Sequence, residues 1–400
     1  MYILGIETSC DETAASVVKD GKTILSNVVV SQIDIFKEYG GVIPEVAARN
    51  HLEVMLPVVH EAIRQAEKND KQFYARNRAF ERKNHTQEER ERGECVPSLK
   101  GIDAIAVTHT PGLIGSLLIG TLTARTLAIL HNKPLYAVHH LKSHIYANWL
   151  SNQNPEFPLL ALVVSGGHTQ IIRMTAHNKF EIIGTTRDDA VGECFDKVAK
   201  ILGLPYPGGP SISKAAKDGD PHKYHFPHPR LSSPNRGETK YSDLDFSFSG
   251  LKTAVLREVQ KAVKKPISFP SHELKNLLTK EQVNDFAASF ENTATDILLE
   301  NLNKALEKYP DTKSICIAGG VSANELLRTK LGTAEDNFSN DKEISLFEKL
   351  SSAVPVYVPN KSLTGDNGAM VAAAAFYEIK EGVKPTDHYT LNIYPRKPIS

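Results

Sequence analysis

Cysteine is scarce in this sequence, which holds four among 400 residues. They stand at Cys10, Cys95, Cys194 and Cys316. No two of them have the short spacing of a thiolate zinc site, and disulfide frameworks belong to short secreted chains with many more cysteines. The pattern therefore predicts a protein of the reducing cytoplasm.

Long apolar runs are also absent. The run Phe157–Val164 is short and contains a proline, whereas a helix that crosses a bilayer needs about 20 apolar residues. The chain enters a strand pattern at Tyr2–Ile6, without the basic region and cleavage site of a secretory signal or an Arg/Ser-rich transit segment. We therefore expect no membrane contact and a cytoplasmic location.

Neither sign of charge dominates, because Lys plus Arg and Asp plus Glu both number 47. Binding to a nucleic acid would therefore depend on a local basic patch. The stretch 71–92 has seven basic residues against four glutamates, and Phe73, Tyr74 and Phe80 lie between them. This composition suits phosphate contacts and base stacking. It is equally compatible with a solvated helix held by ion pairs.

The composition itself is that of a globular protein, with 41% hydrophobic and 24% charged residues in a chain long enough for two or more lobes. Two strand-turn-strand patterns, over residues 2–18 and 159–172, lie about half a chain apart and indicate duplicated lobes. A third segment, Ser314–Ala318, reads as a strand that leads through Gly319 and Gly320 into a helix. Glycine turns often only close a turn, but three in this order indicate a site where backbone amides meet phosphate or ribose.

Other segments are interpreted structurally. Small and aliphatic residues at helical spacing predict a buried helix over Leu113–His131, which includes Leu117, Leu118, Thr121, Ala124, Leu127 and Ala128. Residues 68–99 and 332–351 read as polar insertions, and residues 218–241 as a long loop over a cleft.

A metal site is predicted from two histidines and one acid. His140 and His144 stand four apart at the start of a helix, so they share one face, while His139 points elsewhere. The alternative is that the two histidines are ordinary surface residues or hydrogen-bonded core residues without a metal. Asp366 lies at the start of a later helix, and its alternative role is that of an N-cap. Leu141 follows His140, so the glutamate of an HExxH protease is missing. Two imidazoles and one carboxylate with open positions suit iron or zinc.

Ten segments of the chain together resemble the bacterial TsaD family of tRNA N6-adenosine threonylcarbamoyltransferases, once described as glycoproteases, over nearly the full length. They are Gly5–Thr13, Gly40–Arg49, Pro111–Gly120, His139–His144, Val163–Gln170, Gly192–Lys197, Tyr206–Pro210, Asp245–Thr253, Ala318–Asn324 and Thr364–Met370. Two departures stand out. The acid loop reads Thr-Gly-Asp-Asn where many members have Cys-Thr-Asp-Asn, and the two polar insertions are longer than the family leads us to expect.

The resemblance implies an α/β fold of the actin/Hsp70/sugar-kinase (ASKHA) type, with two duplicated RNase H-like lobes. We expect an N-terminal lobe over 1–135, with the helix 366–381 packed back on it. The C-terminal lobe over 136–365 would carry a metal site and an adenylate pocket at the cleft between the lobes. Its metal ligands would be His140, His144 and Asp366, with Fe²⁺ favoured over Zn²⁺.

The resemblance further implies that threonylcarbamoyl-AMP binds to a set of residues around the glycine turns. They are Val163, Val164, Ser165, Gly166, Gly167, Asp196, Gly209 and Asn324. Backbone amides of Ser165–Gly167 would hold the phosphate, and Asp11 would stand near the reacting centre as the acceptor of the proton that the adenine amine loses.

The activity implied is transfer of the threonylcarbamoyl group to N6 of the adenine beside the anticodon, in tRNAs that read codons beginning with A. TsaB-like and TsaE-like proteins are the implied partners besides tRNA. An ATP-dependent small-molecule kinase on the same scaffold is the principal alternative, and it would not need the histidine pair with Asp366. An Hsp70-like chaperone would need a peptide-binding module, and a non-catalytic scaffold protein is a third alternative.

Overall fold

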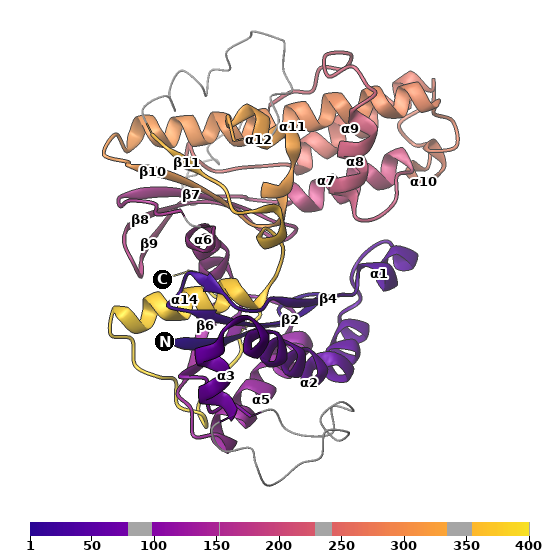
Figure 1. Ribbon diagram of the computed structural model, residues 1–400. Helices are drawn as coiled ribbons and strands as arrows, with labels where there is room; N and C mark the ends of the chain where they lie inside the picture. Colours follow the sequence, from indigo (N-terminus) through magenta and orange to yellow (C-terminus); the bar gives the residue numbers. More distant parts are fainter. Residues whose placement is uncertain (79–97, 152, 229–241, 334–353, 400) are drawn as a thin grey trace. The chain divides into compact units, whose positions relative to one another are not determined.

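The computed structural model describes residues 1–78, 98–151, 153–228, 242–333 and 354–399. Within it the chain forms two compact units (Figure 1). The first comprises Met1–Asn154, His177–Lys179 and Pro359–Ser400. The second comprises Pro155–Ala176 and Phe180–Val358. Most of the predicted insertions 68–99 and 332–351, and residues 229–241 of the predicted loop 218–241, lie outside the described residues.

The first unit is built on a mixed sheet in the order β3-β2-β1-β5-β6, with β4 paired to β2. Its strands are β1 (Tyr2–Glu7), β2 (Glu12–Lys19), β3 (Thr23–Ile24), β4 (Val28–Ser31), β5 (Ala104–Thr110) and β6 (Leu135–His139). Strand β1 is antiparallel to β2 and parallel to β5. All six of its residues are buried, as a central strand covered on both faces requires.

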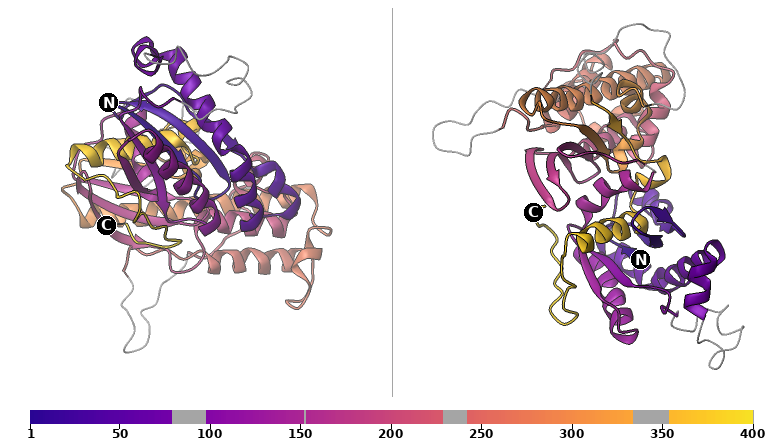
Figure 2. Two further views of the ribbon diagram at one scale, coloured as in Figure 1. Left: turned by 90° about the horizontal axis from the view of Figure 1, so that it is seen from below. Right: turned by 60° about the vertical axis from the view of Figure 1, so that its left-hand side comes forward.

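Helices cover both faces of this sheet (Figures 1 and 2). They are α1 (Ile33–Tyr39), α2 (Pro44–Asn69), α3 (Lys71–Arg78), α5 (Ile114–Leu130), α6 (His140–Leu150) and α14 (Gly368–Lys380), with the short turn η2 (Lys361–Leu363). Helices α2 and α5 pack along each other and bury one face of the sheet, whereas α14 packs on β1, β2 and α6. The contact of α14 with β1 is very close, because a Cβ at Gly5 would lie 2.1 Å from the Gly368 carbonyl oxygen. The start of α14 is thereby fixed against β1.

The second unit repeats this plan with a sheet in the order β11-β10-β7-β8-β9. Its strands are β7 (Leu159–Val164), β8 (Thr169–Ala176), β9 (Lys179–Thr185), β10 (Ser314–Ala318) and β11 (Val356–Tyr357). Its helices are α7 (Val191–Leu202), α8 (Gly208–Ala216), α9 (Ser249–Ala262), α10 (Ser271–Leu274), α11 (Lys280–Lys308), η1 (Gly320–Ala323) and α12 (Glu325–Lys330). A continuous apolar core joins the sheet to these helices.

The two sheets share one arrangement, which confirms the predicted α/β class with duplicated lobes. In each, a hairpin (β1–β2 or β7–β8) extends to a third neighbouring strand on one side, and two parallel strands follow on the other. The strands predicted within 2–18 and 159–172, and at 314–318, are all present.

Two expectations about individual side chains are wrong. Leu118 lies on the solvent side of α5 and is 43% exposed, although the helix itself is where the pattern predicted it. Phe73 is fully buried against Tyr2, with ring centroids 5.2 Å apart, so it is unavailable for base stacking. In the same helix Arg76 and Arg78 form ion pairs with Asp103 and Glu67. Among the described residues, no helix has the length and apolar character needed to cross a membrane.

Candidate metal centre and nucleotide cavity

The junction between β6 and α6 gives its first histidine a role apart from the two that follow. His139 is the N-cap of α6, and its Nδ1 accepts a hydrogen bond from the Leu141 amide at 3.2 Å. Nε2 of His139 must then carry the hydrogen, which it donates to the Lys397 carbonyl oxygen at 2.9 Å. Burial lowers the pKa of His139 to about 3. His139 is therefore a neutral capping residue, turned away from the histidines that follow.

His140 and His144 lie one helical turn apart on the same side of α6, and both are buried. Their ring centroids are 4.6 Å apart and the ring planes meet at 80°. This is the side-by-side placement that the spacing predicted, because residues four apart share a helix face.

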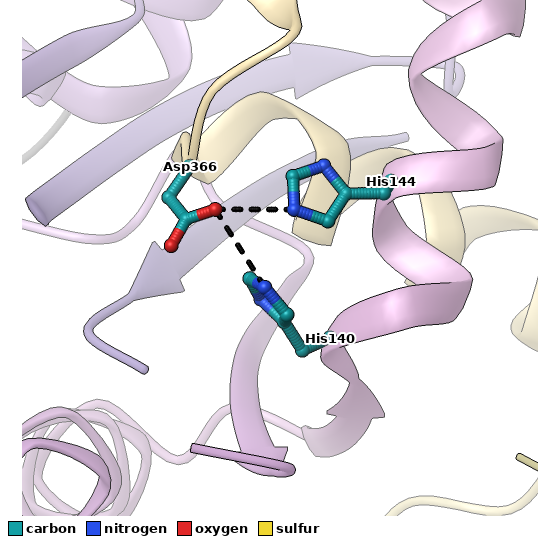
Figure 3. Close-up of side chains that lie close together, drawn as sticks. All are labelled: His140, His144 and Asp366. Carbon is teal, nitrogen blue, oxygen red and sulfur yellow. Dashed lines mark hydrogen bonds and ion pairs between the residues drawn. The ribbon is translucent and has the colours of Figure 1, made fainter. Parts of the chain in front are cut away.

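Asp366 joins this pair from the loop before α14 (Figure 3). Its Oδ1 lies 3.1 Å from His144 Nε2 and 3.6 Å from His140 Nε2. The N-cap of α14 is the next residue, Asn367, whose side chain accepts a hydrogen bond from the Met370 amide at 3.0 Å. The capping role considered for Asp366 is thus taken by its neighbour, and the carboxylate faces the imidazoles instead.

The donor atoms of these three residues fit a metal ion. One ligand atom from each lies within 4.8 Å of the others, at a site formed by largely buried side chains. Nε2 of His140 and Nε2 of His144 both face the same oxygen, Asp366 Oδ1. Two imidazoles and one carboxylate are a common donor set for a catalytic metal with open coordination positions.

A second carboxylate, Glu7 at the end of β1, stands behind His140. Its Oε2 lies 3.1 Å from His140 Nδ1 and accepts a hydrogen bond from the Thr108 hydroxyl at 2.6 Å. Its Oε1 accepts one from the Ser9 amide at 2.6 Å. Glu7 therefore holds the Nδ1–H tautomer of His140 and directs Nε2 toward Asp366. This role was not predicted from the sequence, although Glu7 lies within Gly5–Thr13, one of the segments that carry the family resemblance.

Charges at the site favour a cation. Burial lowers the pKa of His140, but Asp366 and Glu7 outweigh burial and raise it to about 9. Burial raises the pKa of Asp366, but His140 and His144 outweigh it, so the net shift is downward. Burial, with Asp366 and Asp11 nearby, raises the pKa of Glu12 well above its usual value. Asp366 and Glu7 thus favour a positive charge on His140, and a divalent cation bound at the site would take the place of the proton on His140.

Asp11, the predicted catalytic residue, lies in the turn between β1 and β2 and is 8% exposed. The carbonyl oxygen of the residue before it, Cys10, meets His51 Nε2 of α2 at 2.9 Å and the Ser116 hydroxyl of α5 at 3.1 Å. The Asp11 carbonyl accepts a hydrogen bond from the Gln32 amide at 3.1 Å. Asp11 thus sits in a turn held from three sides.

The second unit contains a cavity of about 450 Å³ between the glycine turns and helices α7, α8 and α12. Its lining residues are Gly166, Gly192, Phe195, Asp196, Gly209, Pro210, Ser213, Lys214, Lys217, Gly320, Val321, Ala323, Asn324 and Glu325. Of the predicted substrate-binding residues, Gly166, Asp196, Gly209 and Asn324 are among them.

The other predicted residues are neighbours in sequence of Gly166, which lines the cavity. Val163 and Val164 are fully buried in β7. Ser165 and Gly167 belong to the tight turn that follows, in which the Ser165 amide donates to the His168 carbonyl oxygen at 2.8 Å. Asp196 Oδ1 accepts a hydrogen bond from the Gly208 amide at 2.6 Å and so anchors the start of α8.

Comparison of the sequence with a family model and with individual proteins gives the same family description. The sequence model of the family "TsaD: tRNA N6-adenosine threonylcarbamoyltransferase" matches residues 23–73 and 94–373. The chain is 42% identical over 382 residues to the tRNA N6-adenosine threonylcarbamoyltransferase of Symbiobacterium thermophilum, covering 96% of this chain and 93% of the relative. It is 42% identical over 393 residues to the protein of that name from Listeria welshimeri, covering 98% and 95%.

Similarity to solved structures is more distant. The activator of the 2-hydroxyisocaproyl-CoA dehydratase from Clostridium difficile, with bound ADPNP, matches with a TM-score of 0.44 and 12% identity. The match covers 95% of this chain and 96% of that one.

Proposed function

Because the chain belongs to the tRNA N6-adenosine threonylcarbamoyltransferase (TsaD) family, we propose that it transfers the threonylcarbamoyl group of threonylcarbamoyl-AMP to N6 of the adenine beside the anticodon. The tRNAs concerned are those that read codons beginning with A. The observation that carries the proposal is the convergence of His140, His144 and Asp366, from distant parts of the sequence, on one buried site. The kinase alternative has no need of this site, and the relatives described above bear the transferase name.

The three residues would hold one divalent ion, with Fe²⁺ preferred over Zn²⁺ because two imidazoles and one carboxylate with open positions suit non-haem iron. When bound, such an ion polarises an acyl or carboxylate oxygen and makes the adjoining carbon more electrophilic. Glu7 would keep His140 in the tautomer that binds metal. His144 would contribute Nε2, the ring nitrogen that faces Asp366.

The cavity of the second unit would bind threonylcarbamoyl-AMP. The predicted residues Asp196, Gly209 and Asn324 line it, and Gly166 does so from the Ser165–Gly167 turn. Backbone amides of that turn, with Val163 and Val164 holding it on β7, would contact the phosphate. Asp11 would accept the proton that the adenine amine loses as the new bond to the carbamoyl carbon forms and AMP departs.

The full chain, incubated with threonine, bicarbonate, ATP, an adenylate-forming partner and unmodified tRNA, tests the proposal. Mass analysis of the tRNA nucleosides should show an adenosine that carries the threonylcarbamoyl group. The same mixture with the Asp366→Ala variant should show none. Modified adenosine in both reactions would contradict the metal site, and in neither would contradict the activity.

We assign a partner surface to the exposed apolar side of helices α2 and α5. Leu52 and Leu56 on α2, with Leu118 and Leu122 on α5, are exposed. The two helices pack against each other, and a Cβ at Gly115 would lie 3.0 Å from the Cβ of Ala48. An exposed apolar patch of this kind is typical of an interaction site. On the basis of the family resemblance, we assign this surface to a TsaB-like protein. A TsaE-like ATPase would be a second partner, and the protein would act in the cytoplasm.

A further inference from the structure

A buried carboxylate lies behind the wall of the cavity in the second unit. Glu291 projects from α11 and is 5% exposed. Two residues that line the cavity, Ser213 of α8 and Asn324 at the start of α12, both hydrogen-bond to its Oε1. The Asn324 Nδ2 lies 2.7 Å from this oxygen. Glu291 therefore holds two cavity residues from separate helices.

A second contact of Asn324 fixes which way its hydrogen bonds run. Its Oδ1 accepts a hydrogen bond from the Leu327 amide at 2.8 Å, as the N-cap of α12. The Nδ2 group must then face Glu291, and it also donates to Ser213 Oγ at 3.2 Å. Both hydrogens of the Asn324 amide group are thereby used.

The Ser213 hydroxyl completes the arrangement. Glu291 Oε1 accepts a hydrogen bond from Asn324, and the Ser213 hydroxyl donates its hydrogen to the same oxygen. Ser213 Oγ donates to Glu291 and accepts from Asn324, so one of its lone pairs can accept a further hydrogen bond. This wall consequently offers the cavity an acceptor, which suits a ligand hydroxyl or amine and disfavours a phosphate oxygen.

We propose that Glu291 is a positioning residue that makes Ser213 an acceptor for a ribose hydroxyl of the adenylate. This inference rests on the proposed nucleotide site and sets the direction in which the nucleotide binds there. The sugar would lie at Ser213 and Asn324, and the phosphate toward the glycine turn at Gly166. Carboxylates commonly select ribose by its hydroxyl groups in nucleotide sites.

Binding of adenosine 5′-monophosphate to the full chain, measured by calorimetry beside its 2′-deoxy and 3′-deoxy forms, tests the proposal. The wild type should bind the ribonucleotide about tenfold more tightly than one of the deoxy forms, as expected for one hydrogen bond in a polar, charge-assisted group. Glu291→Leu should reduce this ratio below about threefold, because no side chain then accepts the Ser213 hydrogen and the hydroxyl is released toward the cavity. Glu291→Gln should retain the ratio, because the amide oxygen of the introduced glutamine can accept from both Asn324 and Ser213, as Oε1 does.

Two further variants separate positioning from folding. Ser213→Ala should reduce the ratio as Glu291→Leu does, and the double variant should lose no more than either, because both act through one contact. Asp296→Asn is the matched control. Asp296 lies on the same helix and pairs with Lys330 at 2.7 Å, and its hydrogen bonds are to Lys330 and Asn292, not to Ser213 or Asn324, so the tenfold ratio should persist.

The outcomes are distinguishable. If the wild type binds the ribonucleotide and both deoxy forms equally, or if folded Glu291→Leu protein keeps the tenfold ratio, the role of Glu291 is overturned while the nucleotide site stands. If the wild type binds no adenylate at all, the proposed nucleotide site fails and this inference fails with it.

Discussion

Replacing Glu7 by glutamine should weaken metal binding although Glu7 is not itself a ligand. Its Oε2 faces His140 Nδ1 and the Thr108 hydroxyl, and its Oε1 accepts from the Ser9 amide. If the glutamine nitrogen takes the place of Oε2, it donates to Nδ1 and forces the hydrogen onto Nε2, the nitrogen meant for the metal. If it takes the place of Oε1, it opposes the Ser9 amide. Neither orientation satisfies all three contacts.

The magnitude follows from these contacts. Loss of a hydrogen-bonded carboxylate behind a metal-binding histidine costs about 10- to 100-fold in metal affinity, or about 1.4 to 2.7 kcal/mol. Calorimetric titration of the metal-free protein with Co²⁺ would measure it, with absorption spectra to report the ligand set. A thermal unfolding curve would show whether the variant remains folded.

Glu378→Gln supplies the control. Glu378 is also a buried acid, on α14, but it pairs with Lys142 at 3.8 Å and does not contact the metal ligands. Its replacement should leave Co²⁺ affinity within about twofold of the wild type, well inside the range expected for Glu7. Wild-type affinity in folded Glu7→Gln protein, or an equal loss in both variants, would refute the role given to Glu7.

Four other results are expected. Asp366→Ala should abolish bound metal while His139→Ala retains most of it, as metal analysis of the purified variants would show; equal losses would contradict the ligand set. Metal affinity should rise about tenfold per pH unit from pH 7 toward 9 and then level, because the metal must displace the proton of His140, whose pKa is raised to about 9; titrations at several pH values would reveal a flat profile if this reasoning is mistaken. Gly209→Val should weaken adenylate binding without lowering the unfolding temperature, because a side chain there meets no protein atom within 4 Å and extends into the cavity. Leu118→Glu should weaken co-purification with a TsaB-like protein and leave metal content unchanged, and undiminished binding would remove α5 from the partner surface.

The sequence was sufficient to predict the parts of the site that depend on local spacing. His140 and His144 share a face because they are four apart on a helix, and His139 was expected to point elsewhere, although its capping role emerged only from the structure. The hairpins were equally local. Asp366 was a candidate acid because of its place at the start of a helix, and the family resemblance supported its pairing with histidines that lie more than 200 residues away in sequence.

The parts that escaped prediction depend on contacts between distant segments. Glu7 and Glu291 act through side chains that the fold brings to them from other elements, and neither belongs to a motif of metal ligands or glycine turns. Helical periodicity predicted that α5 is largely buried but could not show that Leu118 falls on its uncovered edge. The burial of Phe73 depends on Tyr2 of β1, which no local pattern reveals.

The close contact of Gly5 with Gly368 has a consequence for biosynthesis. It locks the first strand of the chain, which carries Glu7, against the beginning of the last helix, beside Asp366. The described strands of the first unit's sheet are encoded before residue 140, yet Asp366 is translated more than 200 residues after His144. A nascent chain therefore has no complete three-ligand site until Asp366 has left the ribosome, and a product truncated before residue 366 would lack the acid as well as the helix that covers β1.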